Sequence, residues 1–402
     1  MDKLDIVYLY CPTWDNPVQL SKHHMARYWA GEGHRVLYVE TPPNPLSFLT
    51  RRQEATHLWR RYRRGPDQVA ENLWVHTFFY PLPYRGSRLG FGGTWVNTFN
   101  QAFIRPQMQS VLDRLGFRQP VFLLGCCHGL PLANGVRNSL LAYHCSDDYT
   151  LIDGFPESFP QLEEDLIRRS DLVIATAEEL RQSRLRLNPN TFTVTNGAQI
   201  EHFLTTQAPE MSAAPELDSL SGPVAGFVGS ISSWIDQDWI VEAARQLPDW
   251  NFVFIGPIHT DVSRLKTLPN LHFLGPRPYK EIPRYLRRFD VATLPFEITD
   301  FTRRVSPIKV YEYLAAGIPI VASRLPDLEI IREHIALVDN AAGYAQALPR
   351  VLAEETPEAR RQRMEESKNH SWEARFRQLD LLLEQALETK ERTARRLSPL
   401  KG

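Results

Sequence analysis

Short apolar runs alternate with stretches of helical periodicity along most of this 402-residue chain, and they form two separate series. Apolar runs of this length between helices are typical of parallel strands buried on both faces, so we expect an α/β fold with parallel sheets. The first series predicts strands at Asp5–Tyr10, Arg35–Glu40, Val121–Leu124, Ser139–Tyr143, Asp171–Ala175 and Phe192–Thr195. The second predicts strands at Val224–Val228, Asn251–Ile255, Leu271–Leu274, Val291–Leu294 and Ile318–Ala322.

The two series predict two Rossmann-like domains, over residues 1–204 and 224–370. Residues 205–223 between them are rich in Pro, Ser, Ala and acidic residues, a composition typical of an exposed linker. Residues 371–402 predict a last helix, because Leu379, Leu382, Leu383 and Leu387 recur at helical spacing and need a surface to pack on.

Composition and simple motifs exclude several classes of protein. The 46 Lys and Arg residues nearly balance 47 Asp and Glu residues, which argues against a uniformly basic nucleic-acid binder. Neither half contains G-x-G-x-x-G, which disfavours a nicotinamide-dependent dehydrogenase. No apolar run approaches the roughly 20 residues that span a bilayer, and the N-terminus predicts a strand instead of a signal peptide. The four cysteines have no C-x-x-C spacing, so we expect a cytoplasmic protein without disulfides or zinc; they are Cys11, Cys126, Cys127 and Cys145.

The second series contains four segments whose order and spacing form one pattern: Gly226–Asp236, Phe254–Pro257, Pro269–Tyr279 and Ser306–Ser323. In this order and spacing they resemble the donor domain of bacterial family 4-type glycosyltransferases, which have the GT-B fold. Residues 171–180 and 196–203 resemble the last strand–helix–strand unit of the acceptor domain in that family. The S-P-x-K-x-x-E-Y string that begins at Ser306 resembles the branch that acts on polysaccharide and glycolipid precursors, including glucuronosyltransferase-like enzymes.

The resemblance implies an acceptor-binding N-terminal domain, a nucleotide-sugar-binding C-terminal domain, a cleft between them and a last helix that crosses back to the first domain. The implied reaction moves a sugar from a nucleotide-diphosphate sugar, with a UDP-sugar favoured, to a hydroxyl of a saccharide or glycolipid acceptor. Cell-surface polysaccharide synthesis is the expected setting, without a cofactor. A nucleotide-sugar epimerase on the same fold and an inactive sugar-nucleotide-binding partner protein are the alternatives.

Residues near Ser306 predict the donor site. Ser306 and Pro307 form a good helix start, with Ser306 as N-cap, and a helix N-terminus favours a diphosphate. Lys309 falls in the first turn, where it can neutralise phosphate, and Glu312 is three residues later on nearly the same face. A carboxylate there can accept hydrogen bonds from both ribose hydroxyls. An ordinary Lys–Glu pair on an exposed helix is the alternative.

The resemblance adds Gly229, Ser230 and Arg277 to the donor site. One position departs from the family pattern, because Arg304 stands where the first glutamate of E-x7-E is expected. Its guanidinium suits a carboxylated donor sugar, and a solvent-exposed arginine is the other interpretation.

Asp147 is the predicted catalytic base. It follows a predicted strand and therefore lies at the carboxyl edge of the sheet, where open α/β sheets bind ligands. The adjacent Asp148 can raise its pKa by like-charge repulsion, and the alternative is that both acids cap the following turn. His128, His23 and His24 are weaker candidates.

No metal site is predicted. Asp236-Gln237-Asp238 matches a D-x-D metal motif, but it falls at a helix start where acidic residues satisfy the helix dipole.

The remaining signal is a cluster of arginines. Residues 46–65 hold six arginines against Glu54, with aromatic and leucine side chains interleaved. Such clusters attract anionic lipid, so we expect peripheral contact with the inner face of the cell membrane. A solvated loop is the alternative, and nucleic acid is disfavoured because no binding module surrounds the run. The arginines are Arg51, Arg52, Arg60, Arg61, Arg63 and Arg64.

Overall fold

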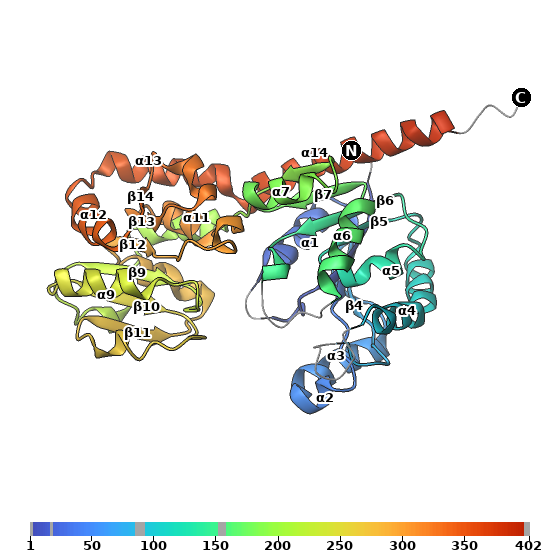
Figure 1. Cartoon of the computed structure of the whole chain (residues 1–402), viewed down its shortest axis with the longest axis horizontal. Helices are drawn as coiled ribbons and strands as arrows, with labels where there is room; N and C mark the ends of the chain where they lie inside the picture. The colour runs from blue at the N-terminus through green and yellow to red at the C-terminus, as the bar shows by residue number, and fades with distance from the viewer. Residues whose placement is uncertain (1–2, 17–18, 85–92, 152–157, 398–402) are drawn as a thin grey trace, which may run out of the picture. The chain divides into compact units, whose positions relative to one another are not determined.

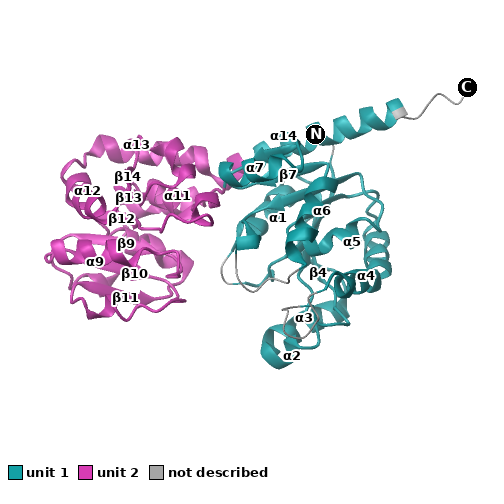
Figure 2. Ribbon diagram, viewed as in Figure 1, with its two compact units in different colours: residues 1–195, 376–402 teal, residues 196–375 magenta. Residues whose placement is uncertain are grey.

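The computed structural model describes residues 3–16, 19–84, 93–151 and 158–397. The chain forms two compact units, coloured separately in Figure 2. Unit 1 comprises residues 1–195 and 376–402, and unit 2 comprises residues 196–375. Each unit contains a parallel sheet with helices packed on it, as the two series of strands predict.

Unit 1 is built on an eight-stranded sheet with the order β3-β4-β2-β1-β5-β6-β7-β8. Its paired strands run parallel, except that β3 runs antiparallel to β4. The central strands are buried along almost their whole length because helices cover both faces of the sheet. The strands are β1 (Asp5–Cys11), β2 (Arg35–Glu40), β3 (Asp67–Ala70), β4 (Leu73–Thr77), β5 (Val121–Leu124), β6 (Leu140–Cys145), β7 (Leu172–Ala175) and β8 (Thr191–Thr193).

The helices of unit 1 differ greatly in length. The longest before the C-terminus is α4 (Thr94–Leu115), which ends at Gly116 in the left-handed conformation that favours glycine. The others are α1 (Ser21–Gly31), α2 (Ser47–Thr50), α3 (Arg52–Arg64), α5 (Leu130–Ala133), α6 (Phe159–Arg169) and α7 (Glu178–Leu185).

The C-terminal helix α14 (Trp372–Leu397) joins unit 1 from Phe376 onward. Leu379 and Leu383 are fully buried, which confirms the predicted packing face of this helix. Polar contacts fix it further: the indole of Trp29 donates a hydrogen bond to Asp380 at 2.6 Å.

Unit 2 is built on a six-stranded parallel sheet with the order β11-β10-β9-β12-β13-β14. The strands are β9 (Val224–Val228), β10 (Asn251–Ile255), β11 (Leu271–Gly275), β12 (Val291–Leu294), β13 (Ile320–Ser323) and β14 (Ala336–Val338). The helices are α8 (Ile200–Leu204), α9 (Gln237–Gln246), α10 (Ile282–Leu286), α11 (Ile308–Ala315), α12 (Ala341–Ala353) and α13 (Pro357–Ser367).

The chain crosses between the units at different places from the predicted linker. It leaves unit 1 after Thr195 and returns at Phe376. Residues 205–223 belong to unit 2, where Ala214 and Leu217 are buried in the core. Proline and serine mark irregular backbone there, but the apolar side chains between them still pack. Within unit 2 the backbone of Ala198 pairs with that of His370 and Trp372, so the two crossing segments lie side by side.

Three strands are absent from the sequence-based prediction. The four residues of β3 are all exposed, and the apolar runs of β4 (Leu73–Val75) and β14 (Ala336–Val338) are only three residues long. Among the helices in the described ranges, none combines the length and apolar composition that crossing a membrane requires.

Candidate active site

Both sheets have a topological switch point, where the strand order reverses. In unit 2 it lies between β9 and β12, and in unit 1 it lies between β1 and β5. Ligands of open α/β sheets bind at the carboxyl ends of strands beside such a point. The residues that follow β9 and β12 in unit 2, and β1 and β5 in unit 1, are therefore candidate ligand-binding positions.

Gly229 and Ser230 follow β9 directly, at the switch point of unit 2. The amide of Gly229 donates to the carbonyl of Ile255 at 2.8 Å, which holds the loop against the end of β10. Gly256 has φ +145°, and a Cβ there would lie 1.9 Å from the Gly229 carbonyl oxygen. The two loops cross so closely that only glycine fits at position 256. A side chain from α11 reaches the same place, since the amide of Val228 donates to the Tyr313 hydroxyl at 2.8 Å.

Lys309 and Glu312 lie one turn apart on α11, as predicted. The Lys309 Nζ and the Glu312 Oε2 are 2.8 Å apart. The Glu312 side chain is only 4% exposed, whereas that of Lys309 is 29% exposed, so this is not the exposed surface pair of the alternative interpretation. Burying a carboxylate is costly unless it is paired. Together with burial, the charge of Glu312 raises the pKa of the Tyr279 phenol, and sequence analysis did not single out that tyrosine.

The prediction that Ser306 caps α11 is wrong. Pro307 keeps an extended backbone with ψ 108°, so the helix begins one residue later, at Ile308, and has no side-chain cap. The Ser306 carbonyl instead accepts a hydrogen bond from Asn196 Nδ2 at 2.9 Å. The Ser306 hydroxyl is buried and has no hydrogen-bond partner among the residues that the structure describes.

Arg277 and Arg304 take different positions near this helix. The Arg277 guanidinium donates to Glu216 Oε1 from Nε at 3.0 Å and from Nη2 at 2.9 Å, and from Nε to the Tyr285 hydroxyl at 2.8 Å. Its charge is therefore already paired within unit 2. Arg304 ends a short 3₁₀ turn (Thr302–Arg304) and is half-buried.

In unit 1, Asp147 lies two residues after β6, which is one strand away from the switch point. Its side chain is half-buried, and burial raises the pKa of its carboxyl to about 6. The positive charge of Lys22 opposes that shift. Lys22 is itself a buried cation on α1, and its Nζ donates to the Gly125 carbonyl at 3.0 Å. Sequence analysis missed this lysine, because it lies far from Asp147 in the chain.

The charge of Asp148 raises the pKa of Asp147, as predicted, but Asp148 is also a structural residue. It is buried, pairs with the Arg184 guanidinium at 3.0 Å, and accepts hydrogen bonds from the backbone and hydroxyl of Thr150. The capping interpretation is therefore confirmed for Asp148. Among the causes that raise the pKa of Asp147, its charge is the smallest, because it is neutralised by Arg184.

We expect Asp148→Ala to lower the free energy of unfolding by about 3 kcal/mol, since it leaves the buried Arg184 short of a partner. Asp147→Asn should change that free energy by less than about 1 kcal/mol. Urea unfolding of both variants measures the difference. Equal losses in the two variants would contradict the separate roles of these acids.

The histidine candidates are held by structural contacts. His23 accepts a hydrogen bond at Nδ1 from the Leu20 amide, and its Nε2 lies 3.1 Å from the Thr13 carbonyl. Burial lowers the pKa of His24 to about 4. The ring of His128 packs edge-on against Tyr84.

Cys126, Cys127 and His128 form the one group of three potential metal ligands in the described ranges, with ligand atoms within 4.8 Å of one another. Two thiols and an imidazole suit a thiophilic ion such as zinc. Sequence analysis did not anticipate this grouping, because the three residues are contiguous and have no finger-like spacing.

The D-x-D match is explained by a helix cap. Asp236 caps α9 by accepting a hydrogen bond from the Trp239 amide at 3.1 Å, as predicted. Asp238 is exposed and pairs with Arg264.

The arginine cluster is only partly at the surface. Arg61 is buried and pairs with Asp15 at 2.8 Å and with the buried Glu40 at 2.5 Å, so it is a structural residue and cannot contact a membrane. The other five arginines are exposed: Arg51, Arg52, Arg60, Arg63 and Arg64.

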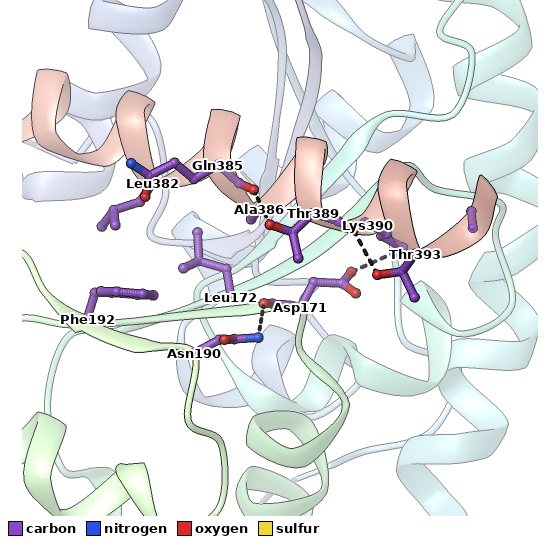
Figure 3. A pocket seen from close by; sticks show the side chains of 11 residues that line it. Asp171, Leu172, Asn190, Phe192, Leu382, Gln385, Ala386, Thr389, Lys390 and Thr393 are labelled. Carbon is purple, nitrogen blue, oxygen red and sulfur yellow. Dashed lines mark hydrogen bonds and ion pairs between the residues drawn. The ribbon is translucent and has the colours of Figure 1, made fainter. Parts of the chain in front are cut away.

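An open groove of about 500 Å³ lies between α14 and strands β7 and β8, and Figure 3 shows the side chains that line it. Lys390 reaches across it to Asp171 at 2.6 Å. None of the predicted site residues lines this groove.

Known proteins are similar to this chain in sequence and in structure, over different shares of its length. Residues 222–354 match the family model described as "Glycosyl transferases group 1". A curated relative, the putative teichuronic acid biosynthesis glycosyltransferase TuaH of Bacillus subtilis strain 168, is 29% identical over 312 residues, which cover 70% of this chain and 77% of the relative. The chain is a glycosyltransferase.

Solved structures show the fold of this glycosyltransferase to be GT-B. HepE of Anabaena, in complex with UDP and glucose, aligns with a TM-score of 0.66 at 14% identity, over 95% of this chain and 99% of HepE. Sucrose-phosphate synthase of Thermosynechococcus elongatus aligns with a TM-score of 0.65 at 15% identity, over 96% of this chain and all of that chain. All the predicted donor-site residues of the glycosyltransferase fall inside the segment that matches the family model, and Asp147 lies outside it.

Proposed function

We propose that this glycosyltransferase transfers a sugar from a UDP-sugar to a hydroxyl of a saccharide or lipid-linked acceptor in cell-surface polysaccharide synthesis. The observation that carries the proposal is the Lys309–Glu312 pair at the start of α11, beside the switch point of unit 2. The relative TuaH supports a role in polysaccharide synthesis, because it is named as a putative teichuronic acid biosynthesis glycosyltransferase. HepE supports UDP as the nucleotide of the donor, since its structure was solved in complex with UDP and glucose.

The donor would bind at the carboxyl edge of the unit 2 sheet. Glu312 accepts hydrogen bonds from the ribose hydroxyls, and Lys309 together with the N-terminal dipole of α11 neutralises the diphosphate. The buried Ser306 hydroxyl, which has no partner among the described residues, supplies a further hydrogen bond. Gly229 and Ser230 bring backbone close to the phosphates. Arg277 contributes to the donor site only indirectly. Its ion pair with Glu216 holds the segment between β11 and α10 in place.

Transfer forms a bond between the acceptor oxygen and the anomeric carbon and breaks the bond between that carbon and the diphosphate oxygen, so UDP leaves. The acceptor hydroxyl loses its proton during this step, and we assign Asp147 as the base that takes it. Lys22 keeps part of the Asp147 population ionised despite burial. We assign Arg304 to bind the carboxylate of a carboxylated donor sugar, because a guanidinium is a good partner for a carboxylate.

Activity should survive EDTA. The negative charge of the leaving diphosphate is balanced by Lys309 and the start of α11, and the D-x-D acids are engaged in a helix cap and an ion pair. The measurement is UDP release with and without chelator, and with added Mg²⁺ or Mn²⁺. Complete loss on chelation, reversed by either ion, would contradict metal-independent transfer.

The exposed arginines of the cluster would hold the protein at the inner face of the cell membrane. Each basic residue near an anionic surface contributes about 1 kcal/mol, and Arg61 is excluded because it is buried. Replacement of Arg60, Arg63 and Arg64 by Gln should weaken binding to anionic vesicles. High salt should have the same effect on the unmodified protein.

Binding of nucleotides tests the proposed donor. UDP should raise the melting temperature in a dose-dependent way, since a ligand that binds only the folded state stabilises it. ADP and GDP should have a smaller effect. No shift with UDP at millimolar concentration would contradict the proposal.

A further inference from the structure

Helix α4 has an unusual distribution of side chains. Its buried face carries amides as well as apolar side chains: Asn97, Asn100 and Gln101 are fully buried, and so are Val96, Ile104 and Met108. Its exposed face carries aromatic rings: Trp95, Phe99 and Phe103 are 62%, 50% and 44% exposed. Residues four apart lie one above the other on a helix, so these rings form a continuous row, which we call the aromatic stripe. An ordinary surface helix has polar side chains on its exposed face.

Hydrogen bonds fix this orientation of α4. Asn97 donates to the His128 carbonyl at 3.1 Å, and Asn100 both donates to and accepts from the backbone of Leu82 at 3.0 Å. Gln101 donates to the Tyr80 hydroxyl at 3.0 Å. Rotating the helix to bury the rings would break these buried bonds, and each unsatisfied group would be costly. The exposure of the aromatic stripe is therefore built into the fold.

The charge around the aromatic stripe is positive. From Thr94 to Ser110 the helix contains no acidic residue, and its one charged side chain is Arg105. A hydrogen bond joins α3 to α4, because the Tyr62 hydroxyl donates to Gln107 Oε1 at 3.0 Å, and Gln107 in turn donates to the carbonyl of Phe103. The exposed Arg60, Arg63 and Arg64 lie within two residues of Tyr62, on the helix that this bond joins to the Phe103 end of the aromatic stripe. Figure 1 shows α2, α3 and α4 together in unit 1.

Helix α2, which packs against α3, also has an exposed apolar side chain. Leu49 is 81% exposed and lies two residues before Arg51 and three before Arg52. Large apolar side chains that gather at a surface mark an interaction site. The surrounding arginines determine which kind of partner fits.

We propose that the aromatic stripe, with Leu49, is a face that enters the interfacial layer of an anionic lipid bilayer. Aromatic rings favour the boundary between headgroups and acyl chains, and arginines favour anionic headgroups. A second copy of this face would bring two sets of arginines together, which electrostatic repulsion opposes. The inference rests on the membrane contact proposed for the arginines, and it identifies the part that reaches the apolar layer.

Vesicle co-sedimentation of the full chain tests this proposal. The vesicles contain phosphatidylglycerol and phosphatidylcholine, with pure phosphatidylcholine as comparison. Phe99→Ser combined with Phe103→Ser should weaken binding to the anionic vesicles by about 10- to 100-fold, because two partly buried rings are lost. The matched control is Ile330→Ser combined with Leu381→Ser, which removes two even more exposed apolar side chains elsewhere and should not change binding.

Insertion and electrostatic attraction are separated by two further measurements. At high salt, the residual binding of the unmodified protein should still depend on Phe99 and Phe103. Brominated acyl chains should quench part of the tryptophan emission, and that part should be lost in Trp95→Phe.

Some outcomes would overturn the proposal. One is equal vesicle binding by the Phe99/Phe103 variant and the unmodified protein. Another is a lipid-free dimer that this variant abolishes, which would make the stripe a protein interface. Transfer to a water-soluble saccharide acceptor reports on the proposed function separately, and it should be unchanged in the variant. An unchanged melting temperature shows that the variant folds.

Discussion

Asp147→Asn is expected to lower turnover by about 10²- to 10⁴-fold while UDP binds with unchanged affinity. The amide keeps the shape of the side chain but cannot accept the acceptor proton. The measurement combines UDP release in the presence of acceptor with a UDP titration. Asp165→Asn, a change of the same type at a half-buried acid of α6 in the same unit, is the control and should keep full activity.

The pH dependence of turnover gives a second readout for Asp147. Burial raises the pKa of this carboxyl to about 6, and only the ionised form can act as a base. Turnover should therefore be constant well above pH 6 and fall about tenfold per pH unit below it. Lys22→Met removes the cation that opposes this shift, so it should move the midpoint to higher pH. Full activity of Asp147→Asn, or a flat profile through pH 6, would contradict the assignment.

Glu312→Gln and Lys309→Ala should each weaken UDP binding by about 10- to 100-fold. Each change removes a charged hydrogen-bonding group, a loss of about 1.5–3 kcal/mol. Isothermal titration of UDP measures the effect.

The control for this pair is another Lys–Glu pair with the same spacing in the same unit. Glu365 and Lys368 pair one turn apart on the surface, so Glu365→Gln and Lys368→Ala should bind UDP normally. Unchanged titration curves for both α11 variants would remove these residues from the donor site. Loss of binding together with a lower melting temperature would indicate damage to the fold of unit 2.

The parts of the fold that sequence analysis predicted well are those with a strong local signal. The buried strands β5, β9, β10 and β12 have the predicted bounds, because a short run of apolar residues between helices has few other interpretations. The polar edge strand β3 has no such signal, since all of its side chains face solvent. Its place in the sheet depends on pairing with β4, which local sequence does not encode.

In the candidate site, too, features that depend on local spacing were predicted and features that depend on distant contacts were not. The spacing of Lys309 and Glu312 is local, and the helix places them together as expected. The roles of Asp147 and Asp148 depend on Lys22 and Arg184, which are distant in the sequence, so the two adjacent acids could not be told apart in advance. Arg61 looked like its neighbours in the arginine cluster, and only the buried Glu40 distinguishes it. The burial of the α4 amides could likewise not be predicted, because it depends on hydrogen-bond partners outside the helix.

The most direct test of the account is UDP release from a set of UDP-sugars, including UDP-glucose and UDP-glucuronate, with and without a teichuronic acid-type saccharide acceptor. The account predicts that at least one UDP-sugar yields UDP, that release requires the acceptor, and that the sugar appears on the acceptor in equal amount. It also predicts loss of this release in Asp147→Asn and in Glu312→Gln. UDP release that is independent of acceptor, or no binding and no release with any UDP-sugar, would contradict the account.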